Sequence, residues 1–453
     1  MPDFTSSARR PRLPLRQRGQ ALIFGIAILL GAAAATFYVF NTGQLTAEKT
    51  KLVNTADAVA YSAGVMHARA LNFDAYTNRA LIANEATIAQ MVSISSWLQY
   101  SKGHVQGVPP LNCYSQYSIP VAMVTISYIP LCYALSYPAG RVAVNYADTI
   151  FNGGGSGGAG AIAVASAEAA KANLKAMQAT MFAGFLFART ALVQEVADAN
   201  YRNDGTVSVT PLPKDDWISF QGGGPFISRH TGNQRQRMRN VILDVVNSDD
   251  FVRNRSWSSS SPWGCPLPNG HADRSGGTVL NGYSSWEARD QAYFEIKAMR
   301  GIIPRCKRIQ YFGLGNGHRK TVTGPPSAQW YYSGVPEFYE LSDAALGYKP
   351  PGSAIPDPRL QYAIRVTRPM NQTRTSAGTS AVKPGGRLHM FDGAAAGGVL
   401  AAVATSEVYF DHQRDDGSTE LGSLFNPYWQ VHLVGNSAAV VAAATALQGA
   451  ASP

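Results

Sequence analysis

The chain has 453 residues and a formal net charge of +10, which is long enough for two or three domains. Only 15% of the residues are charged, while 43 are glycine and 26 are proline, a composition that suits a loop-rich protein outside the cytoplasm rather than a long soluble helical one. The basic balance does not indicate nucleic-acid binding, because five arginines lie in the first twenty residues and no compact basic-aromatic motif follows.

Residues 21–40 contain no charged side chain. As a helix, this segment rises about 30 Å, roughly the thickness of a hydrocarbon core. A cleaved signal peptide is the alternative, with Ala32–Ala35 as the small-residue site, but its apolar core would be shorter, roughly 7–15 residues. We therefore predict a membrane-spanning helix. The side chains expected to contact lipid are Ala21, Leu22, Ile23, Phe24, Ile26, Ile28, Leu29, Leu30, Phe37, Val39 and Phe40.

The flanks of this segment predict its orientation. Residues 1–20 form a basic tail whose only acid is Asp3. Its positive charges are Arg9, Arg10, Arg12, Arg16 and Arg18. Positive charge resists translocation, so we expect a single-pass membrane protein, with a cytoplasmic N-terminus and the rest of the chain outside.

Residues 41–102 are predicted to continue the helix as a stalk. Apolar and small side chains recur there at alternating steps of three and four, in a row that begins Leu45, Leu52, Val59 and a second that begins Ala56, Ala63, Ala70. Such a heptad stripe predicts packing against a helical partner. Residues 161–200 have a similar period, so we favour a return helix of the same chain over an oligomer.

Residues 103–160 are predicted to be a loop between these helices. An apolar stretch, Ile119–Tyr137, is a candidate second span, but Pro120 and Pro130 lie within it. We expect an apolar loop pinned by a disulfide. A second span would return everything after it to the cytoplasm.

The chain has four cysteines, Cys113, Cys132, Cys265 and Cys306. An even number in an exported protein predicts disulfides. Three pairings are open, and proximity in the sequence favours Cys113–Cys132 and Cys265–Cys306. The absence of Cys-x-x-Cys and of any histidine beside a cysteine argues against zinc.

Residues 201–435 are predicted to form an α+β, mainly β domain. Short aromatic or β-branched runs read as strands, and a helix is expected around residues 241–246. The runs lie at residues 206–209, 292–296, 308–312, 361–366 and 402–410. Long loops are expected at residues 256–282 and 344–358. Residues 436–453 are predicted to be an Ala-rich tail, either frayed or a short helix docked on the stalk.

No enzyme motif emerges from the sequence. It lacks the His-Glu-x-x-His zinc motif. Residues 313–317 are glycine-rich but lack the Lys-Ser/Thr of a phosphate loop, and we expect a plain loop there. The acidic run 411–417 lacks EF-hand spacing. We therefore expect no catalytic residues, no metal, no cofactor and no small-molecule substrate.

Four segments carry a resemblance to a known family. They are Arg18–Ala21 with the apolar run, Asn54–Gly64, Asn78–Glu85, and the C-terminal pair Val408–Phe410 and Leu424–Val431. In this order they resemble the TadG-like family of Flp (tight-adherence) pilus-assembly proteins. The resemblance covers both ends of the chain and is weaker in the middle.

The resemblance implies a membrane-anchored structural component of a Flp-type pilus or related secretion system, located in the bacterial inner membrane with the bulk of the chain in the periplasm. It also implies other pilus-assembly or pilin-like membrane proteins as partners. Asn54 and Asp57 lie three apart on one helix face, where they are candidates for a partner contact. A processed prepilin would carry Glu at the fifth position after Gly19, where this chain has Phe24, and the Asp-x-Ser-x-Ser motif of a von Willebrand A domain is absent. The alternatives are a surface adhesin or ligand-binding module, or a minor pilin cleaved after Gly19.

Overall fold

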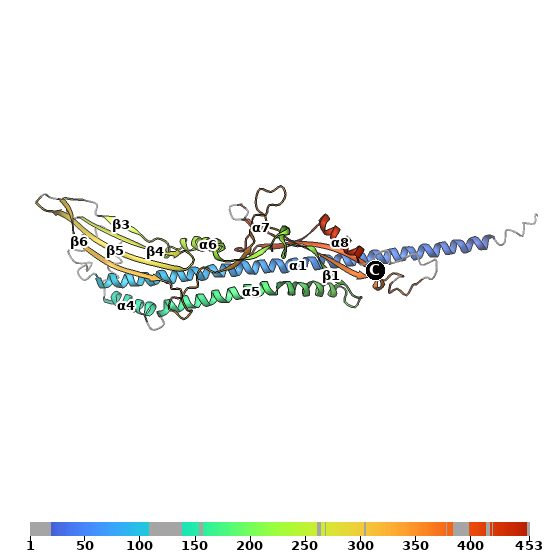
Figure 1. Cartoon of the computed structure of the whole chain (residues 1–453), viewed down its shortest axis with the longest axis horizontal. Coiled ribbons are helices and arrows are strands. Elements are labelled where there is room, and N and C mark those ends of the chain that lie inside the picture. Colours follow the sequence, from blue (N-terminus) through green and yellow to red (C-terminus); the bar gives the residue numbers. More distant parts are fainter. Residues whose placement is uncertain are drawn as a thin grey trace, which may run out of the picture.

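The protein is an elongated α+β molecule built on one long helix, seen here in a computed structural model (Figure 1). The structure describes residues 20–107, 138–153, 157–260, 264–267, 269–302, 305–376, 378–383, 398–413, 417–418 and 420–450. The helices are α1 (Gln20–Gly107), α4 (Pro138–Asn152), α5 (Gly158–Asn200), α6 (Gln236–Asn247), α7 (Asp343–Leu346) and α8 (Ala438–Ala450), with short 3-10 turns at Phe220–Gly222, Gly232–Arg235 and Met370–Gln372. The strands are β1 (Ser208–Asp215), β2 (Ile227–His230), β3 (Trp257–Ser260), β4 (Asn269–Asn281), β5 (Ser285–Arg300), β6 (Arg305–Lys320), β7 (Phe338–Leu341), β8 (Leu360–Pro369), β9 (Val399–Phe410) and β10 (Trp429–Val434).

Helix α1 contains both the predicted membrane segment and the predicted stalk. It has 88 residues, about 130 Å at 1.5 Å per residue. Alanine and other good helix formers fill it and no proline interrupts it. Pro109 and Pro110 follow Gly107 in the sequence, and the residue before a proline disfavours helical geometry.

Helix α5 runs back along α1, and α4 lies beside the far end of α1 (Figure 1). Near the membrane segment, Leu52 and Ala56 of α1 share a buried cluster with Val193 and Ala197 of α5. This confirms the internal return helix predicted from the heptad stripe. Strand residues complete the same cluster, however, so the stalk packs against a sheet as well as a helix.

The first sheet covers the half of α1 that follows the membrane segment. It is antiparallel, in the order β1-β8-β9-β10. Successive residues of a strand face opposite sides: Ile364 of β8 packs toward α1, while Ala363 packs against Val440 of α8. Residues 438–450 therefore form the short helix that was one of the two expectations, but it packs on the outer face of this sheet and not on the stalk.

The second sheet covers the far end of α1. Its order is β3-β4-β5-β6, again antiparallel, and Phe294 and Leu314 pack on Tyr100 of α1. A two-stranded β2-β7 pair lies between the sheets in the buried core. The mixed α+β class is confirmed, and the sheets lie along the stalk.

Three sequence predictions about loops were wrong. Residues 138–152, inside the predicted loop 103–160, form α4, which Lys102 holds to α1 through Asp148 at 2.9 Å. Most of the predicted loop 256–282 is strand, because β3 and β4 pair there with the rest of the second sheet. The glycine-rich residues 313–317 belong to β6, where a Cβ on Gly317 would lie 1.8 Å from the Ser96 carbonyl oxygen. Glycine is needed there for the strand to approach α1.

Candidate functional site

The apolar side chains at the start of α1 are not covered by the rest of the described protein. Leu22, Ile23 and Phe24 are each about 70% exposed, at 69%, 69% and 71%, and Ala21, Ile26, Ile28, Leu29, Leu30 and Val39 are also exposed. Phe37 and Phe40 are half-buried. A surface this apolar requires a nonaqueous environment or a partner, and its length and composition suit a membrane anchor or a signal segment.

Helix α5 is also long and apolar enough to cross a membrane. It differs from the start of α1 because charged side chains on one face, Glu168, Lys171 and Arg189, are buried against the rest of the protein. The arginines of the predicted topology signal (residues 9, 10, 12, 16 and 18), Cys113, Cys132 and the apolar stretch 119–137 all lie outside the described residues.

Just beyond the anchor, α1 keeps one face open. Val53, Asn54 and Tyr61 are exposed, at 38% and 46% for the first and last. Asp57 is half-buried on the same face. We call Val53, Asn54, Asp57 and Tyr61 the open strip. It combines apolar, amide and carboxylate groups, and Asn54 and Asp57 remain candidates for a partner contact.

Further along α1, strands β9 and β10 cover the helix at Gly64 and Asn72. A Cβ on Gly64 would lie 2.4 Å from Cγ2 of Val431 and 3.0 Å from Cβ of Ser406, so only glycine permits this approach of β9 and β10. Asn72 pairs with the backbone of Trp429 through both polar atoms of its side-chain amide. Its Nδ2 donates to the Trp429 carbonyl and its Oδ1 accepts from the Trp429 N–H, each at 3.0 Å. The side chain thereby continues the backbone pairing of β10.

Nearly two turns further on, Asn78 joins three segments. Its Nδ2 donates to the carbonyls of Tyr339 at 2.8 Å and Leu424 at 2.7 Å. Its Oδ1 accepts from Gln178 of α5 at 2.8 Å. Asn78 is fully buried, and these bonds satisfy an amide that would otherwise be costly to bury. The resembling segments near 54–64, 78–85 and 424–431 thus meet on one side of α1.

A second buried contact centres on Glu85 and Lys171. Lys171 Nζ lies 2.5 Å from Glu85 and 2.6 Å from Glu168, with side-chain exposures of 0%, 0% and 7%. Trp286 Nε1 and the Tyr332 hydroxyl both donate to Glu85, at 3.0 and 2.8 Å. Burial, followed by the charge of Glu85, raises the pKa of Tyr332 well above its ordinary value.

A third contact places a histidine in the core. His67 Nδ1 lies 2.7 Å from the Ala63 carbonyl and Nε2 lies 3.1 Å from Arg189, which requires a neutral ring protonated at Nδ1. Arg189 in turn donates to both oxygens of Asp215, at 2.9 and 2.5 Å. Burial, with the nearby Arg189 charge, lowers the pKa of His67 to about 3. These three contacts use charged and polar groups structurally, joining α1, α5 and the strands.

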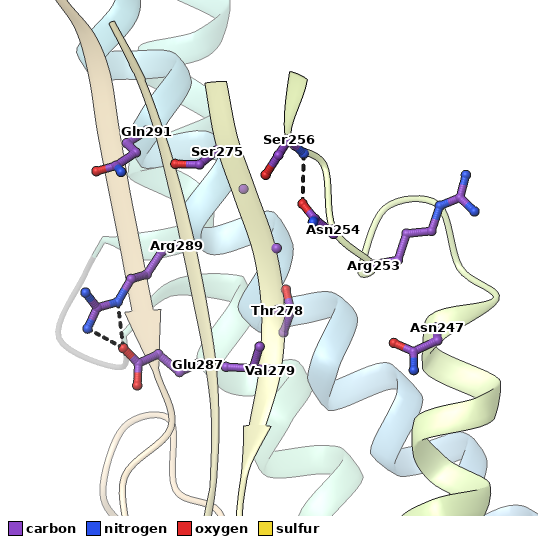
Figure 2. A pocket seen from close by; sticks show the side chains of 12 residues that line it. Asn247, Arg253, Asn254, Ser256, Ser275, Thr278, Val279, Glu287, Arg289 and Gln291 are labelled. Carbon is purple, nitrogen blue, oxygen red and sulfur yellow. Dashed lines mark hydrogen bonds and ion pairs between the residues drawn. The ribbon is translucent and has the colours of Figure 1, made fainter. Parts of the chain in front are cut away.

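A groove of about 530 Å³ lies on the second sheet, beside the loop before β3 (Figure 2). Glu287 and Arg289, on β5 at one side of the groove, pair at 2.6 Å, and Arg253 belongs to the loop at the other side (Figure 2). The hydrogen bond from Arg289, together with its charge, lowers the pKa of Glu287 to about 2. Serine and amide groups line the remainder. The groove offers hydrogen bonds to a polar ligand, but no base lies beside a nucleophile within it.

Among the described residues, no cluster of three or more His, Cys, Asp or Glu side chains has metal-binding geometry. Cys265 and Cys306 form a disulfide across 41 residues of sequence, as the sequence predicted. Sequence reasoning missed the buried roles of Glu85, Lys171, His67 and Arg189. The available signal was that these charged side chains fall at positions which the 3.6-residue period assigns to the buried face of a helix, and this would have predicted buried ion pairs.

The comparisons with known proteins bear on the anchor and the open strip. No curated protein and no solved structure matches the chain. A family model described as "Putative Flp pilus-assembly TadE/G-like" matches residues 19–70. This interval contains the whole apolar segment, the open strip and Gly64. Through residues 19–70, the chain carries a Tad domain of the TadE/G-like pilus-assembly family.

Proposed function

We propose that the protein is a non-catalytic, membrane-anchored structural component that assembles with the machinery of a Flp-type (Tad) pilus or a related secretion system. The N-terminus lies in the cytoplasm, residues 21–40 span the inner membrane, and the rest of the chain projects outside as a rod. The partners are other membrane proteins of the machinery.

One observation carries this proposal: the first and second halves of the Tad domain differ in what covers them. Its apolar first half is bare, while beyond Phe40 one face is packed into the protein's own sheets and α5. A helix that has already used this face internally is not free to form a long coiled coil with a partner. The bare anchor and the open strip therefore remain as the surfaces for lipid and for neighbouring proteins.

Orientation is tested by labelling with a membrane-impermeant maleimide in intact spheroplasts. Ser7→Cys marks the basic tail, and Gly224→Cys marks an exposed loop in which an added Cβ meets nothing within 4 Å. We expect label on the Gly224 variant without permeabilisation, and on the Ser7 variant only after it. The reverse pattern would refute the orientation. The wild-type chain, whose native cysteines are retained in both variants, gives the background.

Partner contact is tested by a photo-crosslinking amino acid at Asn54 in cells that contain the complete pilus machinery. The matched control is the same residue at Asn173, which is exposed on α5. We expect Asn54 to capture a pilus-assembly membrane protein and Asn173 to capture none. Equal capture at both positions, or capture of unrelated abundant proteins alone, would contradict the assembly role.

A minor pilin cleaved after Gly19 is the second candidate, favoured by the exposed apolar side chains at the start of α1, such as Leu22, Ile23 and Phe24. A pilin uses such a bare helix to pack in a filament. The mass of the mature N-terminus separates the two functions: an intact Arg-rich tail supports the permanent anchor, and a chain that begins at Gln20 supports the pilin.

A further inference from the structure

The β5–β6 hairpin extends beyond the body of the molecule at the end opposite the anchor (Figure 1). The last contacts of this sheet with α1 are made by residues such as Ile296 and Leu314, which pack on Tyr100. Residues 297–302 and 305–309 continue past them, and we call these residues the arm. Residues 297–300 of β5, four more residues of strand, reach about 13 Å further at 3.3 Å each.

The arm is strongly basic. Between Ile296 and Ile309 the sequence has five cations, at Lys297, Arg300, Arg305, Lys307 and Arg308, and no acid. Glu295 pairs with Lys297 at 2.7 Å and with Arg308 at 3.6 Å. Within the described part of the chain, Arg300, Arg305 and Lys307 have no acid within ion-pair distance.

The pairing of the two strands concentrates this charge. Arg300 lies directly opposite Arg305, and Lys297 lies opposite Arg308. Like charges at directly opposed positions destabilise a hairpin. Glu295 relieves the second pair, and no described acid relieves the first. An external anion would remove this repulsion.

Apolar side chains accompany the cations. Ile302, next to the turn, is completely exposed at 105%, and Met299 is 40% exposed. Gly301, with φ 111°, begins the turn that follows β5 and contains Ile302. The Cys265–Cys306 disulfide ties the arm to the segment before β4. Ile302 and Met299 therefore remain exposed, and the described core of the protein does not cover them.

Basic residues around an exposed aliphatic side chain are the combination that binds anionic lipid surfaces, because headgroup phosphates attract the cations while the aliphatic group enters the interface. We infer that the arm binds the surface of an anionic membrane that faces the far end of the rod. The 67 residues of α1 after Phe40 span about 100 Å, so an upright rod would hold the arm away from the anchor's own bilayer. The protein would then bridge two membranes.

The test uses the full chain in nanodiscs of zwitterionic lipid, which occupy the anchor. Binding to free vesicles is measured by flotation, with vesicles of phosphatidylcholine alone or with about one third phosphatidylglycerol. We expect binding only to the anionic vesicles, weakening as salt is raised. Arg300→Ser/Arg305→Ser/Lys307→Ser should reduce it at least about tenfold, and Ile302→Ser should weaken it without changing its salt dependence.

The matched control removes three exposed cations elsewhere, Arg202→Ser/Lys349→Ser/Lys383→Ser, with the same change in net charge. Equal losses in the two triple variants would overturn the inference, because binding would then follow net charge alone. Equal binding to both kinds of vesicle would overturn it too. Capture by soluble polyglutamate without capture by anionic vesicles would identify an acidic protein partner and reject the membrane.

Discussion

Lys171 offers the most informative single perturbation, because one buried cation serves two carboxylates. Its Nζ lies 2.5 Å from Glu85, 2.6 Å from Glu168 and 3.1 Å from the Gly334 carbonyl. Lys171→Met keeps much of the side-chain volume but leaves both acids buried without a cation. Breaking a buried pair in this way costs about 3–5 kcal/mol. We expect that loss in the free energy of unfolding.

The assay is urea unfolding of the full chain in detergent, followed by tryptophan fluorescence. The control is Lys175→Met, one turn along the same helix at a half-buried position, which should change stability by less than about 0.5 kcal/mol. Adding Glu85→Gln to Lys171→Met removes one stranded charge and keeps acceptors for Trp286 and Tyr332, so it should recover part of the loss. A cost below about 1 kcal/mol for Lys171→Met, or no recovery in the double variant, would refute the ion-pair reasoning.

Three further outcomes are expected in the same assay. Gly64→Ala should destabilise by about 1–3 kcal/mol because its Cβ meets Val431, whereas Gly184→Ala, in open space on α5, should stabilise by roughly 0.5–1 kcal/mol; equal signs would contradict the close approach. For His67, the unfolded ring takes up a proton below about 6.5 while the folded ring resists until about 3, so acid favours the unfolded state. Between pH 7.5 and 5, the wild type should lose about 2 kcal/mol more than His67→Gln, and parallel pH profiles would show that His67 titrates normally. Burial, with the nearby charge of Glu340, raises the pKa of Asp74 well above its ordinary value of 3.8. The protonated Asp74 therefore contributes to the free energy of unfolding in full below about 3.8, and this contribution is lost as pH rises through the folded pKa. Asp74→Asn should therefore be more stable than wild type at neutral pH, by about 1–3 kcal/mol, with a gap that closes on acidification; a gap that widens in acid would reverse this assignment.

The sequence predicted the parts of the fold whose physics is local. A long uncharged run and an unbroken 3.6-residue period predict helices, and both α1 and α5 follow them closely. Strands such as β8 and β9 were predicted by their β-branched residues. β4 was missed because Ser275, Gly276 and Gly277 disfavour a strand locally. Pairing with β5 overrides that preference.

The contacts of the site could not be predicted in the same way. Asn72 and Trp429 are separated by 357 residues, and no periodicity in one segment predicts the register of another. Asn78 and Glu85 could be quoted only as part of a resemblance, without roles. Their roles depend on which backbone carbonyls and indole groups the tertiary fold brings to them.

The contact between Gly64 and β10 has a consequence for the order in which the protein is completed. Helix α1 is synthesised first, but the strand that covers its Gly64 face is among the last segments to emerge. Until residues 429–434 arrive, Gly64, Ala68 and Ala70 lack the cover that Trp429 and Val431 provide. A chain that stops short of β10 would leave this part of α1 open to proteases and chaperones. Folding at the base of the rod is therefore completed only after translation has passed most of the sheets.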